Sequence, residues 1–491
     1  MKRKYLFLFV PLLLALTCIL YSCEEEQEGV FTVITEDFLY VSGERVIVVG
    51  RILSLGNKAV QNHGFEISTT PQFNNNITIS LSDRDKPGRF IGEYAGLQLG
   101  TQYYCRAFLA LESEIIYGNV LNFETLTVDI TGFSPALAAA GEELIINGKN
   151  FSDNTEVFFG NRKAQIIELL FESQLKVIVP PIIDDFRVPI TVKTQDQELQ
   201  FDQLFEYVIG KWELVSEFSS NQQLIETISI LDGDNILYGL GRVGNVINNK
   251  IWSLNLTTLS WSETVYNGAA LSGAFFTSGF FGSGVDLFSP FGSTISNQVY
   301  RIQDGNFVQS VPLSLPLYKS VAFTSGDDLY VFGGSPNLRD YNYSVFRYST
   351  ASNAWQPVSV VPFVIGIENP SFSYAGKQYF VMPNSQIWQF TPPANWQQVS
   401  AYPGTNFGTE GMAVTIGDKA YIGVANQSDV WELDIPNLTW KRKTGFPATT
   451  MQRNVSAFAY NDDIYLLRRY TGPPVNPLPP LAVWKFDPDA W

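Results

Sequence analysis

The sequence predicts an all-β protein in which two β-sandwich domains precede a six-bladed β-propeller. Between residues 30 and 208, short alternating apolar and polar runs are separated by turn residues, as in antiparallel sandwiches. From residue 209 to 491, an aromatic residue recurs every 41 to 51 positions. A period in this range, with four short strands per unit, is typical of propeller blades, so six intervals predict six blades. The landmark aromatics are Trp212, Trp261, Phe307, Trp355, Trp396, Trp440 and Trp491.

The first 22 residues have the features of a secretion signal. Residues 1–4 are basic, residues 5–20 are almost wholly apolar, and the segment ends in Leu-Tyr-Ser-Cys at Cys23. A short apolar run of this kind indicates a cleaved leader rather than a membrane span. The ending resembles a bacterial lipobox, which implies cleavage before Cys23 and lipid attachment to its thiol. Two or more acyl chains would anchor the chain stably in a membrane. The alternative is an ordinary signal peptide with an incidental cysteine.

Residues 23–29 form an acidic tether that contains Glu24, Glu25 and Glu26. This tract resembles the export signal behind the lipidated cysteine of surface lipoproteins in Bacteroidota-type bacteria. The resemblance implies the outer membrane, with the protein facing the medium. A tether that is merely solvated is the alternative.

Composition restricts the classes of function. Apolar residues make up 45% of the 491 positions, which is enough for several cores. Loss of the leader would leave 29 basic against 48 acidic residues, a net charge of −19. An acidic chain of this kind is not expected to bind nucleic acid through charge.

Cysteine and histidine are too few for several kinds of site. Cys18 would leave with the leader and Cys23 would carry lipid, so Cys105 cannot form an intramolecular disulfide in the mature chain. Cys105 lies in an alternating strand and is expected to be a small buried apolar residue. The single histidine, His63, precedes Gly64 and is expected to be a turn residue. The propeller segment has no histidine for a metal site or a nucleophilic triad.

Residues 30–127 resemble a bacterial fibronectin type III domain. The segment from Leu97 to Tyr103 is similar to the start of a late strand in such sandwiches. The resemblance implies that the Tyr103 hydroxyl bonds back to the backbone a few residues upstream.

Residues 128–208 resemble an IPT/TIG domain, which is another immunoglobulin-like sandwich. The matching segments are 130–135, 144–151, 157–160, 175–180 and 205–207. Each is an alternating strand closed by Gly, Pro or Asn at a turn. In that family such domains are commonly spacers or protein-contact modules.

The units of the propeller segment resemble Kelch repeats. The clearest unit runs from Ala322 to Trp355 and contains the pair Gly333-Gly334. In Kelch repeats, paired glycines let the second strand pack closely near the axis. Residues 211–218 are expected to supply the outer strand of the last blade, which would remove two exposed sheet edges.

Motifs that could bind cofactors are explained better by turns. Residues 239–244 spell G-x-G-x-x-G after a strand, but the sequence that follows is loop-like, and a phosphate needs a helix N-terminus. Acidic pairs such as Asp327-Asp328 recur between the first two strands of a blade, where hairpin turns are expected rather than calcium sites. A Kelch-type copper oxidase would need histidine ligands and a Tyr–Cys crosslink. We therefore expect no cofactor and no metal.

Loops that interrupt the repeat are the best candidates for a ligand site, because loops on a rigid scaffold carry function. Aromatic, amide and arginine side chains suit sugar or protein surfaces. The landmark tryptophans, by contrast, are expected to fill the space between blades. The loop candidates are Arg242, Asn248, Asn337, Arg339, Asp340, Tyr341, Tyr343, Asn426, Gln427, Arg468, Arg469 and Tyr470.

These patterns predict a non-catalytic lipoprotein of the outer membrane that binds a partner protein or a glycan as an accessory to a surface complex. One alternative is a glycan-active enzyme, such as a mutarotase or epimerase similar to Kelch-fold sialic-acid mutarotases, or a lyase or hydrolase. It would need carboxylates or Arg/Glu groups that meet at the central channel, for which Arg468, Arg469 and Glu410 are candidates. A structural subunit of an envelope assembly is the third hypothesis.

Overall fold

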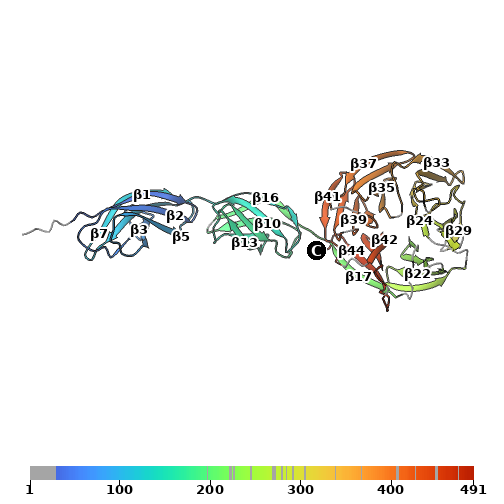
Figure 1. The fold of residues 1–491 in the computed structure, drawn as a ribbon, viewed down its shortest axis with the longest axis horizontal. Coiled ribbons are helices and arrows are strands. Elements are labelled where there is room, and N and C mark those ends of the chain that lie inside the picture. Colours follow the sequence, from blue (N-terminus) through green and yellow to red (C-terminus); the bar gives the residue numbers. More distant parts are fainter. Residues whose placement is uncertain are drawn as a thin grey trace, which may run out of the picture. The chain divides into compact units, whose positions relative to one another are not determined.

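The protein is described by a computed structural model in which every regular element of the described residues is a β-strand, so the predicted all-β class is confirmed (Figure 1). Among those residues no helix could cross a membrane. The chain forms two compact units, Met1–Glu206 and Tyr207–Trp491. The described residues are 29–195, 197–219, 224, 227–243, 246–267, 273–277, 280–283, 285–289, 292–303, 306–337, 339–366, 368–404, 408–425, 427–447, 452–473 and 475–491.

Several sequence predictions fall outside these ranges. The leader, Cys23, the residues Glu24–Glu26 and the loop residue Asn426 are not described, and neither is the side chain of Arg242.

The first unit contains two sandwiches, and each has two antiparallel sheets. The first sandwich pairs a three-stranded with a four-stranded sheet: β1 (Thr32–Val41), β2 (Arg45–Ser54) and β5 (Gly88–Ala95) face β4 (Ile77–Ser80), β3 (Asn62–Ser68), β6 (Gln102–Ala110) and β7 (Ile115–Glu124). The second sandwich pairs a four-stranded with a five-stranded sheet. In the four-stranded sheet the strand order is β13 (Gln165–Leu170), β14 (Gln174–Ile178), β10 (Glu143–Lys149) and β8 (Asp129–Ser134). In the five-stranded sheet it is β12 (Arg162–Lys163), β11 (Glu156–Phe159), β15 (Arg187–Thr194), β16 (Gln197–Tyr207) and β9 (Leu137–Ala138).

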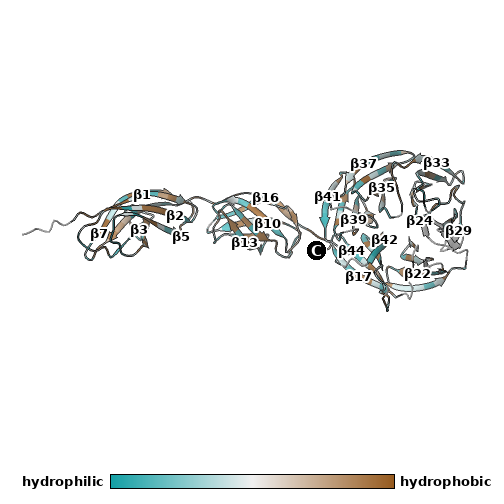
Figure 2. Cartoon of the chain, in the orientation of Figure 1, coloured by the Kyte–Doolittle hydropathy of each residue, from teal (hydrophilic) through white to brown (hydrophobic). Residues whose placement is uncertain are grey.

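Alternation along the strands builds each core. In β10, Leu144 and Ile146 are fully buried while Glu143 and Asn147 are exposed. Successive side chains of a strand point to opposite faces, so one face of each sheet is apolar. Figure 2 shows this alternation as brown and teal along the strands.

Three predictions for the first sandwich can be compared with the structure. The Tyr103 hydroxyl accepts a hydrogen bond from the Gln98 amide at 3.0 Å, so the predicted tyrosine corner is confirmed. Cys105 is fully buried in the core, as expected. The prediction for His63 is wrong. His63 lies inside β3, is buried against Phe90, and has its Nδ1 2.7 Å from the Ser82 carbonyl oxygen. Burial lowers its pKa, and its partner is the backbone just after the neighbouring strand β4.

The second unit contains six four-stranded antiparallel sheets in its described part, so the predicted fold of six blades is confirmed. We number the blades by chain order of their innermost strand. Blade 1 consists of β18 (Ile228–Asp232), β19 (Asn235–Gly239), β22 (Lys250–Asn255) and β23 (Ser260–Val265). Blade 2 consists of β24 (Gly273–Thr277), β25 (Phe280–Ser283), β28 (Val299–Gln303) and β29 (Asn306–Gln309). Blade 3 consists of β30 (Val321–Ser325), β31 (Asp328–Phe332), β32 (Ser344–Ser349) and β33 (Ala354–Val360).

Blades 4 to 6 complete the ring. Blade 4 consists of β34 (Ser371–Tyr374), β35 (Lys377–Val381), β36 (Gln386–Thr391) and β37 (Asn395–Ala401). Blade 5 consists of β38 (Met412–Ile416), β39 (Lys419–Gly423), β40 (Val430–Asp434) and β41 (Thr439–Lys443). Blade 6 consists of β42 (Gln452–Tyr460), β43 (Asp463–Tyr470), β44 (Leu481–Asp487) and β17 (Lys211–Phe218). Two small hairpins extend blades 1 and 2, namely β20 (Arg242–Val243) with β21 (Val246–Ile247) and β26 (Val285–Ser289) with β27 (Gly292–Ile295).

The ring closes as the sequence predicts. Strand β17 pairs antiparallel with β44, with Trp212 opposite Phe486 and Phe218 opposite Leu481. Blade 6 therefore takes its outermost strand from the start of the unit and its other three from the end. This pairing covers one edge of each of the two strands, and β17 is the outermost strand of the blade.

The landmark tryptophans join neighbouring blades. Trp261 of blade 1 donates from Nε1 to Ser216 of blade 6 at 2.9 Å, and Trp440 of blade 5 donates to Ser400 of blade 4 at 3.1 Å. Trp212 and Trp355 reach the backbone next to the preceding blade in the same way. For these four tryptophans, the predicted position between blades is confirmed. Trp491 is 57% exposed, so the prediction is wrong for that residue.

Candidate functional site

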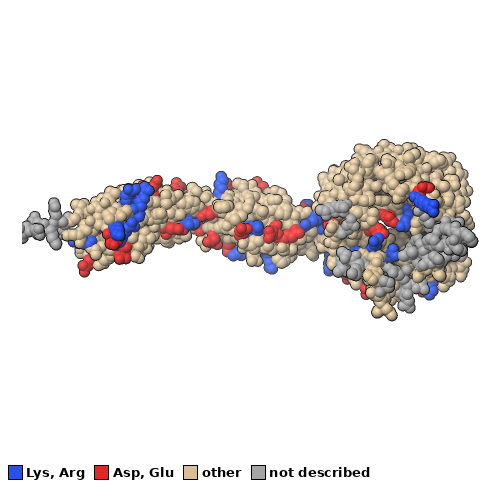
Figure 3. All heavy atoms as spheres, viewed as in Figure 1, with Lys and Arg blue, Asp and Glu red and all other residues tan. Residues whose placement is uncertain are grey.

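A cavity of about 850 Å³ occupies the centre of the propeller. Its walls include the innermost strands β18, β30, β34, β38 and β42. Figure 3 shows basic and acidic side chains gathered around the hollow in the middle of the propeller. A cavity of this size is within the range of small-ligand pockets.

One mouth of the cavity is formed by the connections that lead from one blade into the next. In a four-stranded antiparallel blade, these connections lie at the same end as the loops between the second and third strands. The bridge between Tyr318 and Ser335 shows this proximity, since it joins the connection before β30 to the loop after β31. Gly334 in that loop allows the approach, because a Cβ there would lie 2.5 Å from the Ser320 hydroxyl.

Four polar residues occupy corresponding positions around this mouth. In each blade, one residue in or next to the innermost strand lies opposite the fifth residue of the second strand. The position two residues before that opposite residue is polar in blades 3 to 6. It is occupied by Lys319, Glu368, Glu410 and Asn454. We call this set the mouth residues. All four line the cavity. Lys319 and Glu410 both have a φ of 59°, a left-handed conformation that non-glycine residues rarely adopt outside constrained sites.

The mouth residues are linked from blade to blade. Lys319 forms an ion pair with Glu368. The Glu410 amide donates to the Glu368 carbonyl at 2.9 Å. Asn454 Nδ2 donates to the carbonyls of Glu410 at 2.9 Å and Val424 at 2.7 Å. Arg453 Nη1 lies 2.8 Å from Glu410 Oε2. These contacts fix the backbone positions of the mouth without occupying the cavity.

Two arginines in β43 differ in their surroundings. Arg469 lines the cavity, and its Nη1 donates to the Leu224 carbonyl at 3.2 Å. Among the described residues it has no carboxylate within ion-pair distance. Arg468 is only 7% exposed, stacks on Phe446 at 4.4 Å and donates to the Gln452 carbonyl. Burial lowers the pKa of Arg468 to about 10, and its Nε has no hydrogen-bond partner in the described chain.

The deeper walls carry small and hydroxyl-bearing side chains. Ser229 of blade 1 and Ser456 of blade 6 share a hydrogen bond between their hydroxyls. Ser373 donates to Gln378 within blade 4. Alanine and valine residues fill positions between them, such as Ala413 and Val414. This part of the cavity can accept a narrow polar group, while charges are concentrated at the mouth.

The predicted loop from Asn337 to Tyr343 lies on the same side as the mouth, but it does not line the cavity. Asn337 Oδ1 accepts from the amides of Arg339 and Asp340, and its Nδ2 donates to Asp340 at 2.6 Å. These residues therefore shape the loop itself. Tyr341 and Tyr343 are 60% and 45% exposed.

The remaining predicted residues divide in a similar way. Asn248 Oδ1 accepts from the Lys250 amide, and its Nδ2 is buried without a partner in the described chain. Gln427 is exposed, and the Tyr470 hydroxyl donates to the Pro473 carbonyl. Among the predicted loop residues with described side chains, Arg469 alone lines the cavity, where it is joined by Glu410. Sequence reasoning missed Lys319, Glu368, Arg453 and Asn454. Lys319 and Glu368 are polar residues just before an innermost strand, and Arg453 and Asn454 lie at the start of β42.

The motifs assigned to turns lie in turns. Asn461 and Asp462 have φ values of 50° and 63° between the paired residues Tyr460 and Asp463. After Gly241 the chain forms the β20–β21 hairpin. In the described part of the chain, no three His, Cys, Asp or Glu side chains are placed to hold a metal ion.

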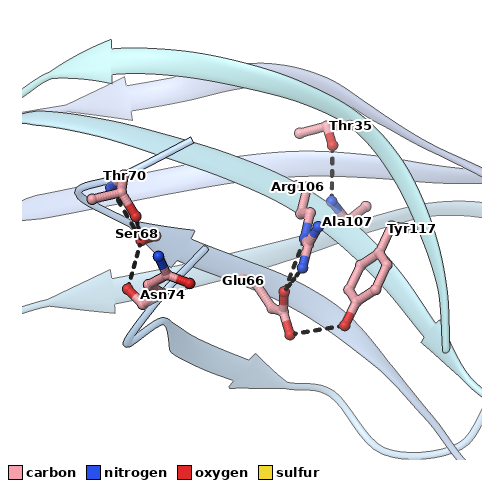
Figure 4. Close-up of polar contacts among 8 residues, drawn as sticks. All are labelled: Thr35, Glu66, Ser68, Thr70, Asn74, Arg106, Ala107 and Tyr117. Carbon is pink, nitrogen blue, oxygen red and sulfur yellow. Dashed lines mark hydrogen bonds and ion pairs between the residues drawn. The ribbon is translucent and has the colours of Figure 1, made fainter. Parts of the chain in front are cut away.

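A second polar cluster lies on the first sandwich. The Arg106 guanidinium donates to Glu66 Oε2 at 2.7 and 2.9 Å, with the Tyr117 ring beside it (Figure 4). It contacts the rings of both Phe73 and Tyr117. The centroid distances of 4.0 and 3.5 Å are typical of cation–π contacts. The guanidinium is already engaged by the carboxylate and both rings. This cluster therefore braces the sheet and offers no free group to a ligand.

Comparisons with known proteins agree with the domain content. Residues 129–207 match the IPT/TIG domain, and residues 317–359 match the Kelch motif. The chain thus contains an IPT/TIG domain and a Kelch motif, which suggest a protein-binding or scaffold role. No curated protein matches the chain.

Two solved structures are similar in part. A protein of unknown function from Bacteroides thetaiotaomicron is 12% identical with a TM-score of 0.39, over 73% of this chain and 97% of that one. The structure of YjhT is 13% identical with a TM-score of 0.43, over 55% of this chain and 95% of that one.

Proposed function

We propose that this chain is a non-catalytic binding protein whose propeller holds a partner protein or a glycan at the mouth of its central cavity. The observation that carries the proposal is the ring of mouth residues from four successive blades, which opens onto a cavity of about 850 Å³ beside Arg469. The polar atoms are held in place by contacts between blades, so little ordering is needed when a ligand binds. The IPT/TIG domain and the Kelch motif favour this role.

The proposal includes a lipid anchor at Cys23 and an outer-membrane location facing the medium, as an accessory to a surface complex. Its support is the lipobox-like ending of the leader and the acidic residues Glu24–Glu26. Metabolic labelling with a fatty acid should mark the protein, and Cys23→Ala should abolish the label. Protease added to intact cells should degrade the protein, and replacement of Glu24–Glu26 by alanine should protect it.

Binding at the mouth is tested with the full chain purified from its native membrane in detergent. Arg469→Gln with Lys319→Ala should remove the bound protein or glycan, because both side chains line the cavity. Lys377→Ala is the matched control, since Lys377 begins β35 next to the turn after β34, at the other end of the blade. A ligand retained equally by both variants would place the binding surface elsewhere.

An enzyme acting on glycans is the second candidate, and one observation favours it. Glu368 and Glu410 lie on adjacent blades at the same mouth, joined by a backbone hydrogen bond, with Arg469 on the cavity wall. Carboxylates and arginines that meet at a cavity are the groups an epimerase, lyase or hydrolase would need. Each carboxylate here is held in an ion pair, which is less suited to proton transfer. Turnover of a reducing sugar or oligosaccharide, followed by NMR and lost in Glu410→Gln, would support this candidate over the binding role.

A further inference from the structure

The hairpin between β13 and β14 in the second sandwich displays a phenylalanine to solvent. Phe171 is 93% exposed, more than any other large apolar side chain in the described chain. The next most exposed is Val246, at 72%. Ile167, on the same hairpin, is 42% exposed. An isolated exposed apolar residue is ordinary on a protein surface, so it is the backbone conformation at Phe171 that sets this residue apart.

The backbone at Phe171 has an unfavourable conformation for its residue type. Phe171 and Glu172 have φ values of 51° and 53°, and the Ser173 amide donates to the Leu170 carbonyl at 3.0 Å. Two central residues with positive φ define a type I′ turn, for which Asn-Gly is strongly preferred. The corresponding turn of blade 6 uses Asn461 and Asp462, which tolerate this conformation better. The sequence thus places a bulky aromatic where a small polar residue would be more stable.

Contacts elsewhere in the hairpin hold the turn in place. Tyr40 of the first sandwich donates from its hydroxyl to the Glu172 carboxylate. The Phe151 amide donates to the Glu172 carbonyl at 2.9 Å, and the Gly148 amide donates to the Ser173 carbonyl at 2.8 Å. These contacts explain Glu172. They leave the exposed ring of Phe171 unexplained within the described chain.

The charged groups of this hairpin and its neighbouring strand indicate the chemistry of a partner surface that could contact Phe171. Lys176 is shared by Glu168 at 3.2 Å and Glu143 at 3.8 Å, and Glu172 adds a third carboxylate at the turn. Within this sheet the three carboxylates outnumber the one ammonium, with Glu143 on β10 opposite the far end of β14. The Arg45 guanidinium of the first sandwich lies 6.0 Å from the ring of Tyr40, the partner of Glu172. Strand β13 is the edge strand of its sheet and pairs with β14 alone among the described strands. Strained backbone conformations cluster at functional sites, and aromatic residues are enriched at protein interfaces.

We propose that the β13–β14 turn is a contact site for a partner protein, which receives Phe171 in an apolar pocket bordered by basic side chains. This interface is separate from the cavity of the propeller and does not depend on the function proposed for that cavity. The rigid turn presents the ring in one orientation, and this reduces the entropy lost when the pocket closes around it.

The first test is photo-crosslinking in the native cells with the full chain. A benzoyl-phenylalanine at position 171 should give an adduct with one other protein, identified by mass spectrometry. The matched position is Leu204, which is 50% exposed in β16 of the same sandwich. The same adduct from position 204, an adduct between two copies of this chain, or no adduct at all would overturn the proposal.

The second test distinguishes a role in binding from a role in folding, because one substitution should raise the melting temperature and weaken binding. Phe171→Asn suits the left-handed turn, so the melting temperature should rise by about 2–4 °C. Binding to the crosslinked protein should fall at least about tenfold, the loss typical of an anchor residue. Phe171→Trp should keep the binding. Unchanged binding of Phe171→Asn, measured with the two purified proteins, would contradict the proposal even if the melting temperature rises.

Discussion

Trp212 stacks on Phe486 with their ring centroids 4.6 Å apart, so the first strand of the propeller packs on its last. Phe486 is fully buried and contacts the core shared by blades 5 and 6. The two residues are more than 270 positions apart in sequence, and they pair across β17 and β44. The stability of the whole ring therefore depends on a segment at each end of the unit.

Removal of residues 480–491 should open the ring, because it deletes β44 and leaves β17 without its partner. Phe486→Ala should destabilise the propeller by about 3–5 kcal/mol, the usual cost of emptying a buried aromatic site. The measurement is denaturant unfolding of the full chain. Trp491→Ala is the control, since Trp491 is 57% exposed and should change stability by less than about 0.5 kcal/mol. Equal effects at the two positions would argue against the closure.

Lys443 should stabilise the same closure through a buried ion pair. Its Nζ lies 3.1 Å from Glu432 Oε2 and donates to the Pro488 carbonyl at 2.8 Å, which ties the end of the chain to blade 5. Lys443→Ala would leave Glu432 buried with Lys419 as its remaining cation. We expect a loss of about 3 kcal/mol. Lys377→Ala, a lysine without an ion pair in the described chain, should cost less than about 0.5 kcal/mol, and a similar loss from both would contradict a specific role for Lys443.

Tryptophans at equivalent positions differ in one hydrogen bond, which gives a matched comparison. Trp440 donates to Ser400 at 3.1 Å, whereas Trp396 Nε1 is buried without an acceptor among the described residues. Both rings fill the space between blades, so a change to phenylalanine should remove similar volume. Trp440→Phe should therefore cost about 1 kcal/mol more than Trp396→Phe. Calorimetry of the two variants gives the difference, and a larger loss at Trp396 would be inconsistent with it.

The blade count and the closing strand could be predicted because both follow from local patterns. The aromatic at each fourth strand and the Asp-, Asn- or Gly-containing turns recur along the sequence, and a period of this length admits few architectures. The tyrosine corner at Tyr103 was predictable for the same reason, since its partner Gln98 is five residues away.

The cavity was harder to predict because its residues come from separate blades. Lys319, Glu368 and Glu410 are about 40 to 50 positions apart, and each is an ordinary polar loop residue when considered alone. Only the ring brings them together. The exposed loop at Asn337 has the more conspicuous composition, but its amide and carboxylate groups satisfy one another. His63 was misassigned because the glycine after it suggested a turn, whereas Gly64 lies within β3.

Cys105 provides a pH-dependent prediction for the first sandwich. Burial raises the pKa of its thiol from about 9 in an exposed chain to about 12. Between these values the unfolded thiol loses its proton while the folded one keeps it, so the unfolded state binds fewer protons. Stability should therefore fall as pH rises above 9, by up to about 1.4 kcal/mol per pH unit from this group.

Cys105→Ala should remove that part of the slope while lowering stability at neutral pH. The measurement is urea unfolding of both proteins between pH 8 and 10.5. Identical slopes would mean that the Cys105 thiol is as accessible to ionisation in the folded state as in the unfolded one.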